Sequence, residues 1–126
     1  MADVNEKKRI LHVDDEQDTL AVVKTILEHE GYEVVSVDKG GRAIEEITLD
    51  GYDLLIFDIM MPDMSGWELF SRIGKIKPGY RVIFLSILEA SAEKLKELKD
   101  AGVKDYIRKP FDRADLVSRV KKAMEE

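Results

Sequence analysis

Short apolar runs alternate with longer amphipathic segments along the whole chain. The apolar runs predict five strands, at residues 9–13, 33–37, 52–57, 81–85 and 105–107. After each strand, apolar residues recur at helical spacing, which predicts helices over residues 17–30, after Gly41, after Gly66, over residues 91–100 and after Asp112. Five strands that alternate with five helices are typical of a doubly wound α/β domain with a parallel sheet.

The run at residues 52–57 is the most continuous apolar stretch of the chain. A strand that is apolar on both faces is expected at the centre of a parallel sheet, because helices cover it from both sides. Right-handed crossovers then bring the carboxyl ends of all five strands to one edge, where folds of this class bind their ligands. The pattern alone therefore predicts the edge of the sheet at which a site lies.

Polar side chains stand at that edge. Asp14 and Asp15 follow the first strand, Asp58 the third and Ser86 the fourth, and Lys109 comes shortly after the fifth. Each residue alone is usually a turn residue, a helix cap or a solvated charge. All five together favour a site, because crowded carboxylates repel one another unless a cation neutralises them. Oxygen ligands without a His or Cys cluster favour Mg²⁺, with Mn²⁺ as the alternative, and a lysine and a hydroxyl suit a tetrahedral anion.

Size and composition narrow the class of protein. The chain has 126 residues and no cysteine, which favours a single domain (1–126, with its core at about 8–124) in a reducing compartment such as the cytoplasm. Its net charge of −6 argues against a nucleic-acid-binding surface over the whole domain. No apolar run reaches the roughly 20 residues of a membrane span. We therefore expect neither membrane insertion nor direct binding of nucleic acid.

Four ordered segments carry a resemblance to a known family. They are Asp14-Asp15-Glu16, the stretch from Phe57 to Gly66, Ser86, and Lys109-Pro110-Phe111. In this order the chain resembles the response-regulator receiver domain, the phospho-acceptor module of two-component signalling, over about residues 8–124. The resemblance implies a flavodoxin-like (CheY-like) parallel sheet with strand order 2-1-3-4-5 and five flanking helices.

The resemblance assigns chemistry to the acidic residues. Asp58 would accept a phosphoryl group from the phosphohistidine of a sensor histidine kinase or of a histidine phosphotransfer protein. Asp15 and Asp58 would bind Mg²⁺ directly, Asp14 would act through water, and Met60 would contribute its backbone carbonyl. The metal would offset the repulsion between the carboxylate and the incoming phosphoryl oxygens.

Further residues would complete the site. Lys109 would pair with the phosphoryl oxygens, and the Lys109–Pro110 peptide bond would be cis, an isomer that proline permits at modest cost. Pro62 and Gly66 would shape the loop that follows the phosphorylated aspartate.

The same resemblance implies a switch. Ser86 would move to bond the phosphoryl group, and Tyr106 would turn into the vacated space, which changes the face formed by the fourth helix, fifth strand and fifth helix. That face would contact a downstream effector or output domain, or form a dimer. The domain would then catalyse only its own phosphorylation and dephosphorylation and would not be an enzyme with a separate substrate. It could stand alone, serve as a phosphorelay intermediate, or be part of a longer regulator.

Three positions depart from the usual family pattern. Ile87 stands where a small residue is common beside the phosphorylation pocket, so we expect restricted access for phosphodonors. Met60 and Leu88 occupy positions that tune hydrolysis of the aspartyl phosphate in the family, and both are apolar here. The hypothesis is that they leave the attacking water poorly placed and give a long-lived phosphorylated state.

Alternative functions make different demands on the sequence. An aspartate-nucleophile phosphatase needs a second acid two residues after the nucleophile, and that position is Met60. A flavin site needs a phosphate-binding loop after the first strand, where Asp14 and Asp15 would repel phosphate. A receiver fold used only for docking that is independent of phosphorylation would not need the acidic pair together with Asp58 and Lys109.

Two further side chains have open roles. His12 lies inside the first strand, where a structural role is expected rather than a catalytic one. Trp67 follows Gly66, and it is expected either to anchor its helix or to report metal binding near Asp58.

Overall fold

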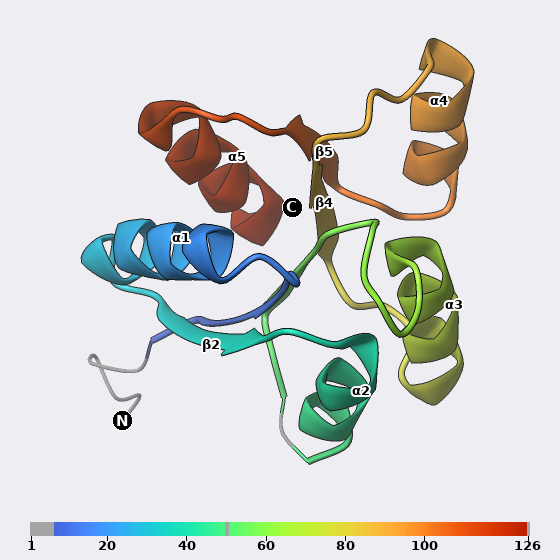
Figure 1. The fold of residues 1–126 in the computed structure, drawn as a ribbon, viewed down its shortest axis with the longest axis horizontal. Coiled ribbons are helices and arrows are strands. Elements are labelled where there is room, and N and C mark those ends of the chain that lie inside the picture. Colours follow the sequence, from blue (N-terminus) through green and yellow to red (C-terminus); the bar gives the residue numbers. More distant parts are fainter. Residues whose placement is uncertain (1–6, 50, 126) are drawn as a thin grey trace.

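The computed structural model describes residues 7–49 and 51–125 and shows a parallel five-stranded sheet between two layers of helices (Figure 1). The strands lie in the order β2-β1-β3-β4-β5, as the family resemblance implies. Their bounds are β1 Arg9–Val13, β2 Glu33–Val37, β3 Leu54–Phe57, β4 Val82–Ser86 and β5 Asp105–Arg108. The expectations for residues 1–6 and 126 lie outside the described residues.

Helices cover both faces of the sheet. Helices α1 and α5 lie on one face and α2, α3 and α4 on the other (Figure 1). Their bounds are α1 Gln17–His29, α2 Gly40–Leu49, α3 Gly66–Ile76, α4 Ala92–Asp100 and α5 Arg113–Glu125. Among the helices of residues 7–49 and 51–125, none has the length and apolar character that crossing a bilayer requires.

Each face of the sheet builds its own apolar core. Successive side chains of a strand point to opposite faces, so Ile10 packs with the residues of α1 and α5 while Leu11 packs with those of α2, α3 and α4. The side chains of β3 are all fully buried. The continuous apolar run in the sequence is therefore required by a strand that is covered on both sides.

Strand β3 begins at Leu54 and not at the predicted residue 52. Tyr52 is buried in the core that contains Ala43 and Ile47 of α2, and its hydroxyl donates a hydrogen bond to Glu46 Oε1 at 2.6 Å. The aromatic character of this position therefore serves packing against α2. A pattern of apolar residues cannot separate this use from strand pairing.

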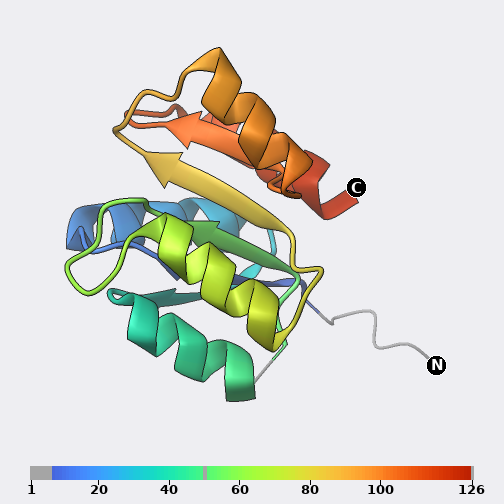
Figure 2. The same ribbon diagram turned by 90° about the vertical axis from the view of Figure 1, so that its right-hand side faces the viewer.

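The carboxyl ends of the strands meet at one edge of the sheet. Figure 2 shows the arrowheads directed to the same side, where the loops that precede α3 and α4 also lie. The backbone register aligns these ends, since Val13 of β1 pairs with Val37 of β2 and Phe57 of β3. Any side chain that follows a strand is thereby brought near those that follow its neighbours.

His12 is a fully buried polar residue in β1, between Ser36 of β2 and Ile56 of β3. Neither ring nitrogen has a hydrogen-bond partner in the described part of the chain. Burial, and to a smaller extent the charge of Lys109, lower the pKa of His12 to about 3. The predicted place inside the first strand is confirmed, the side chain is buried in the core, and the ring is neutral at neutral pH.

The His12→Val variant tests this description. In the unfolded chain the imidazole takes up a proton below about pH 6.5, whereas the folded protein resists protonation down to a pKa of about 3. Between these values the unfolded state binds more protons, so this residue lowers stability by up to about 1.4 kcal/mol for each pH unit of acidification and contributes no slope above that range. In urea denaturation without divalent cations, we expect wild type to lose stability more steeply than His12→Val from about pH 6.5 to pH 5. Equal slopes would contradict the assignment.

Candidate functional site

Three carboxylates meet at the carboxyl edge of the sheet. One oxygen from each of Asp14, Asp15 and Asp58 lies within 4.8 Å of the other two. The N–H of Asp14 donates to the carbonyl of Val37 at 3.2 Å, and the N–H of Asp58 donates to the carbonyl of Val13 at 2.9 Å. The register of the parallel strands thus places the acids together, as the sequence analysis expects.

Lys109 provides a positive charge beside this acidic cluster. Its Nζ lies 2.8 Å from Asp14 Oδ2, 3.2 Å from Glu16 Oε1 and 3.5 Å from Asp58 Oδ2. Burial disfavours the ammonium, but the hydrogen bond and charge of Asp14, followed by the charge of Asp58, raise the pKa of Lys109 above its ordinary value. The Lys109–Pro110 peptide bond is cis, as expected.

The surroundings of Asp58 disfavour the ionised form of its carboxyl group. Its side chain is almost fully buried. Burial, then the charge of Asp14, raise the pKa of Asp58, while Lys109 and the N–H of Ile59 act in the opposite direction. The net upward shift means that one lysine does not compensate this cluster. Additional positive charge near Asp58 would stabilise the carboxylate.

The neighbours Asp14 and Asp15 differ in their surroundings. Asp14 is fully buried, its Oδ1 accepts a hydrogen bond from the N–H of Glu16 at 2.9 Å, and its Oδ2 accepts one from Lys109. Asp15 is exposed and has no hydrogen bond in the described part of the chain. A hard cation at this cluster would find the oxygens of Asp15 available, whereas both oxygens of Asp14 are already engaged.

The loop of residues 59–65 joins Asp58 to α3. Its two ends meet, because the N–H of Gly66 donates to the carbonyl of Ile59 at 2.8 Å. A Cβ on Gly66 would lie 2.3 Å from the carbonyl oxygen of Asp58, so the closure requires glycine. Met60 lies inside this closed loop with 55% of its surface exposed. Pro62 is exposed in the same loop.

Trp67 connects this loop to the core and to α4. Its ring lies 4.6 Å from the ring of Phe84, and the ammonium of Lys94 stands 4.6 Å from the centre of the indole. Trp67 also lines a cavity of about 500 Å³ together with Asp15 and Met60. The residue therefore anchors α3 and also adjoins the acidic cluster, so both of its expected roles fit its position.

Ser86 and Tyr106 both bind the backbone of Leu88. Ser86 is the last residue of β4 and is fully buried, and its Oγ accepts a hydrogen bond from the N–H of Leu88 at 3.2 Å. The hydroxyl of Tyr106 donates to the carbonyl of Leu88 at 2.5 Å. Tyr106 packs with the cluster that contains Leu98, while Val117 belongs to the core on the opposite face. One residue of the β4–α4 loop thus joins the two predicted switch side chains.

Ile87 lies on the side of the site that faces α1. It is 60% exposed and lines a groove of about 610 Å³ together with Lys109, Pro110 and Val22. Leu88, the next residue, is 39% exposed. The groove beside Lys109 is therefore lined by both apolar residues, such as Ile87, and charged residues, such as Asp18 and Arg113.

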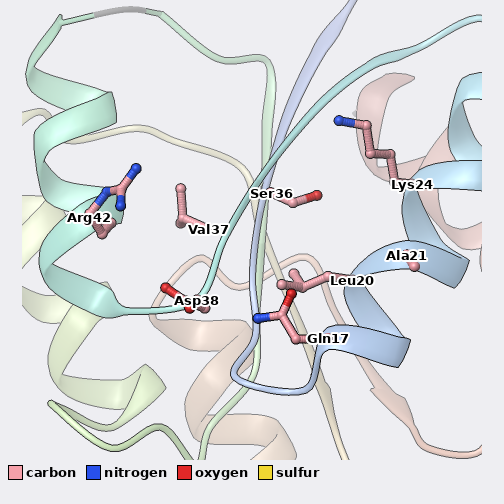
Figure 3. Close-up of a pocket in the computed structure, with 8 residues that line it drawn as sticks. All are labelled: Gln17, Leu20, Ala21, Lys24, Ser36, Val37, Asp38 and Arg42. Carbon is pink, nitrogen blue, oxygen red and sulfur yellow. The ribbon is translucent and has the colours of Figure 1, made fainter.

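A separate groove of about 400 Å³ lies between α1 and the end of β2 (Figure 3). Figure 3 shows Lys24 and Arg42 on opposite sides of it, with Asp38 and Gln17 between them. Its charged side chains are spread along the groove, whereas the carboxylates of Asp14, Asp15 and Asp58 lie close together.

Two contacts around the site are not indicated by the sequence pattern. Glu16 reaches Lys109, and Asp63 binds the backbone of Gly40 and Gly41 at the start of α2. The contact of Glu16 with Lys109 could have been predicted from the sequence, because Glu16 directly follows the acidic pair. The second joins residues more than twenty positions apart, and no local pattern indicates it.

The molecule is a doubly wound α/β domain with its sheet in 2-1-3-4-5 order. An acidic cluster and a lysine lie together at the carboxyl edge of this sheet. The chain belongs to the response regulator receiver domain family, whose profile matches residues 10–121. The fold is accordingly the CheY-like variant of the flavodoxin fold.

Solved structures and curated relatives agree with this membership. A CheY-like receiver domain protein from Methanospirillum hungatei is 38% identical, with a TM-score of 0.86 and 95% coverage of both chains. The response regulator TrrA from Thermotoga maritima, solved in complex with Mg(2+)-BeF, is 35% identical, with a TM-score of 0.78 and coverage of 92% of this chain and 98% of that one.

Two transcriptional regulators are also similar in sequence. CrdR of Helicobacter pylori is 36% identical over 117 residues, which are 92% of this chain and 54% of CrdR. The uncharacterized transcriptional regulatory protein YkoG of Bacillus subtilis is 34% identical over 121 residues, which are 96% of this chain and 53% of YkoG. The chain therefore spans about half the length of these curated relatives.

The crowding of charge predicts an unusual effect of Asp58→Asn on stability. The folded-state pKa of Asp58 is raised, so the ionised group costs stability as the pH rises through that pKa, and a neutral amide avoids this cost. At neutral to mildly alkaline pH without divalent cations, we expect the variant to melt above wild type, with each kcal/mol gained worth roughly 3–6 °C.

Glu45→Gln provides the matched control, because Glu45 is an exposed carboxylate on α2 away from the cluster. Its melting temperature should stay close to that of wild type. A melting temperature of Asp58→Asn at or below the wild-type value would show that the cluster is not electrostatically crowded.

Proposed function

We propose that this chain is the phospho-acceptor domain of a two-component system and that Asp58 is the phosphorylated residue. One observation carries the proposal: the Asp58 carboxylate is clustered with an acidic pair, Asp14 and Asp15, and lies 3.5 Å from the ammonium of Lys109, which also bonds Asp14. Family membership supports it, as does the Mg(2+)-BeF complex of the relative TrrA.

The donor in this proposal is the phosphohistidine of a sensor histidine kinase or a histidine phosphotransfer protein. An oxygen of Asp58 forms a bond to phosphorus while the P–N bond of the donor breaks. The electron pair of that bond stays on the imidazole, which leaves as a neutral ring because its other nitrogen is protonated. Lys109, 3.5 Å from Asp58 Oδ2, stands where it can pair with the phosphoryl oxygens.

The side chains present fit a hard divalent cation. Asp15 and Asp58 would hold Mg²⁺ directly together with the carbonyl of Met60, and Asp14 would act through water, since both its oxygens are already engaged. Mn²⁺ suits the same oxygen donors. When bound, the ion supplies positive charge that offsets the repulsion between the carboxylate and the phosphoryl oxygens.

Ser86 and Tyr106 would carry the signal away from the site. Ser86 now accepts the N–H of Leu88, so turning its hydroxyl toward a phosphoryl group would break that bond. The carbonyl of Leu88 holds Tyr106, so a change at this residue reaches β5 directly. The face of α4, β5 and α5 would then change its affinity for an effector, for an output domain, or for a second copy in a dimer.

The likeness to regulators about twice as long favours an output domain or a separate effector protein as the downstream partner. The domain would work in the cytoplasm as a switch that turns over only its own phosphoryl group. The residue two positions after Asp58 is Met60, so the acid that a phosphomonoester hydrolase needs is missing from that position.

Intact-mass measurement tests the phospho-acceptor. Wild type incubated with a small-molecule phosphodonor and Mg²⁺ should gain the mass of one phosphoryl group, and Asp58→Asn should not, because its amide cannot act as the nucleophile. Chelation of the cation should abolish the gain in wild type.

The Ile87→Ala variant completes this measurement. If the isoleucine restricts access, this variant should phosphorylate faster than wild type with the same donor, and an unchanged rate would remove the access hypothesis alone. A phosphoryl mass on Asp58→Asn that equals the wild-type gain would refute the assignment of Asp58.

The exposed apolar residues Met60 and Leu88 predict a long-lived phosphorylated state. They flank the site with 55% and 39% of their surfaces exposed and offer no side-chain group that orients water. The double variant Met60→Asn, Leu88→Glu should lose its phosphoryl group on the order of tenfold faster, less than the roughly 10²–10⁴-fold that a fully positioned acid–base group contributes. The decay of phosphorylated protein after removal of the donor measures this rate, and equal rates would refute the hypothesis.

A further inference from the structure

The loop that carries Met60 is bound to a distant element, the first turn of α2. The carboxylate of Asp63 accepts one hydrogen bond from the N–H of Gly40 at 3.1 Å and one from the N–H of Gly41 at 3.0 Å. These donors have no partner inside the helix, because the first N–H groups of an α-helix are left free. The bonds, that from Gly41 first, favour the carboxylate and lower the pKa of Asp63.

Close packing reinforces this contact. Gly40 is buried, and a Cβ at that position would lie 2.5 Å from Met64 Cγ and 2.6 Å from Met64 Sδ. Met64 therefore packs directly on the backbone of Gly40. Helix α2 is itself fixed to the sheet by Ala43 and Ile47, which are both buried in the core.

Met60 lies between two points of attachment. At the base of the loop, the N–H of Gly66 is bonded to the carbonyl of Ile59. At the tip, Asp63 is bonded to α2. A peptide between two fixed points has few orientations available, so its carbonyl is held in place before any ligand arrives.

We propose that Asp63 is a positioning residue, which holds the loop of residues 59–65 against α2 and so orients the Met60 carbonyl for the divalent cation. The inference rests on the proposed function, which places that cation at Asp15 and Asp58. Without this contact the loop is free to move before the ion binds. Binding must then order the loop, and the lost conformational entropy weakens the affinity for the ion. Linkage also requires the reciprocal effect: the bound ion must strengthen the hydrogen bonds between Asp63 and α2 by the same factor.

Magnesium titrations of the full chain test whether the Asp63 contact strengthens binding of the ion. Calorimetry and the fluorescence of Trp67 measure the binding. Asp63→Ala should bind Mg²⁺ about tenfold more weakly than wild type, within the usual range of coupling between sites. Asp63→Asn retains one acceptor oxygen and should lie between the two. Ser91→Ala, which removes the side-chain cap of α4 (3.1 Å from the N–H of Lys94), should bind as wild type does.

A steric pair of variants tests the same contact from the side of α2. Gly40→Ala should weaken Mg²⁺ binding, because its Cβ displaces Met64 and the loop with it. Adding Met64→Ala to this variant removes the overlap and should recover most of the affinity. No recovery would show that the geometry at Gly40 does not act through the loop.

Amide hydrogen exchange tests the reciprocal effect and does not depend on phosphorylation. Saturating Mg²⁺ should slow exchange of the Gly40 and Gly41 amides in wild type and leave it unchanged in Asp63→Ala. Mg²⁺ affinities that are equal in wild type and Asp63→Ala would overturn the positioning role while the proposed function stands. Failure of wild type itself to bind Mg²⁺ would overturn the proposed function.

Discussion

The crowding of negative charge at the carboxyl edge of the sheet is the constraint on which the rest of this molecule depends. Strand pairing fixes where Asp14 and Asp58 lie, so the two carboxylates cannot move apart without breaking the register of β1 and β3. Both are shielded from solvent, and Lys109 compensates them only in part, since the pKa of Asp58 remains raised. The two apolar cores hold the strands, and with them the carboxylates, in place. A positive charge added near the cluster would stabilise its carboxylates.

The same edge contains two loops that are held in different ways. The β3–α3 loop is closed by a backbone bond at Gly66 and bound to α2 through Asp63. The β4–α4 loop is held through the peptide groups of Leu88, which bind a hydroxyl on either side. The first arrangement suits a part of the site that must stay in place, and the second suits a part that must exchange one hydrogen bond for another.

The sequence predicts the order of elements and the edge of the site because both follow from local patterns and topology. A buried parallel strand must be apolar throughout, which predicts the central strand within residues 52–57, and parallel strands must bring Asp14 and Asp58 together. Contacts between distant segments leave no such pattern. The sequence pattern therefore places Tyr52 in a strand, although this residue packs against α2. Nothing in the pattern indicates the hydrogen bond between Gly40 and Asp63. The roles of single residues came from the family resemblance and remain proposals.

The end of β1 explains why two adjacent aspartates have different surroundings. Side chains alternate along a strand, and Asp14, directly after β1, still follows this alternation and points to the same side as His12, where it is buried. Asp15 lies one residue further from the end of the strand and is exposed. His12 is 3.8 Å from Asp14 but is kept neutral by burial, so the charge of Asp14 is met by Lys109 instead. That choice of partner matters, because Lys109 also reaches Asp58. Had His12 been protonated, Asp14 would have been compensated inside the core, and the lysine would be less firmly held at the acidic cluster.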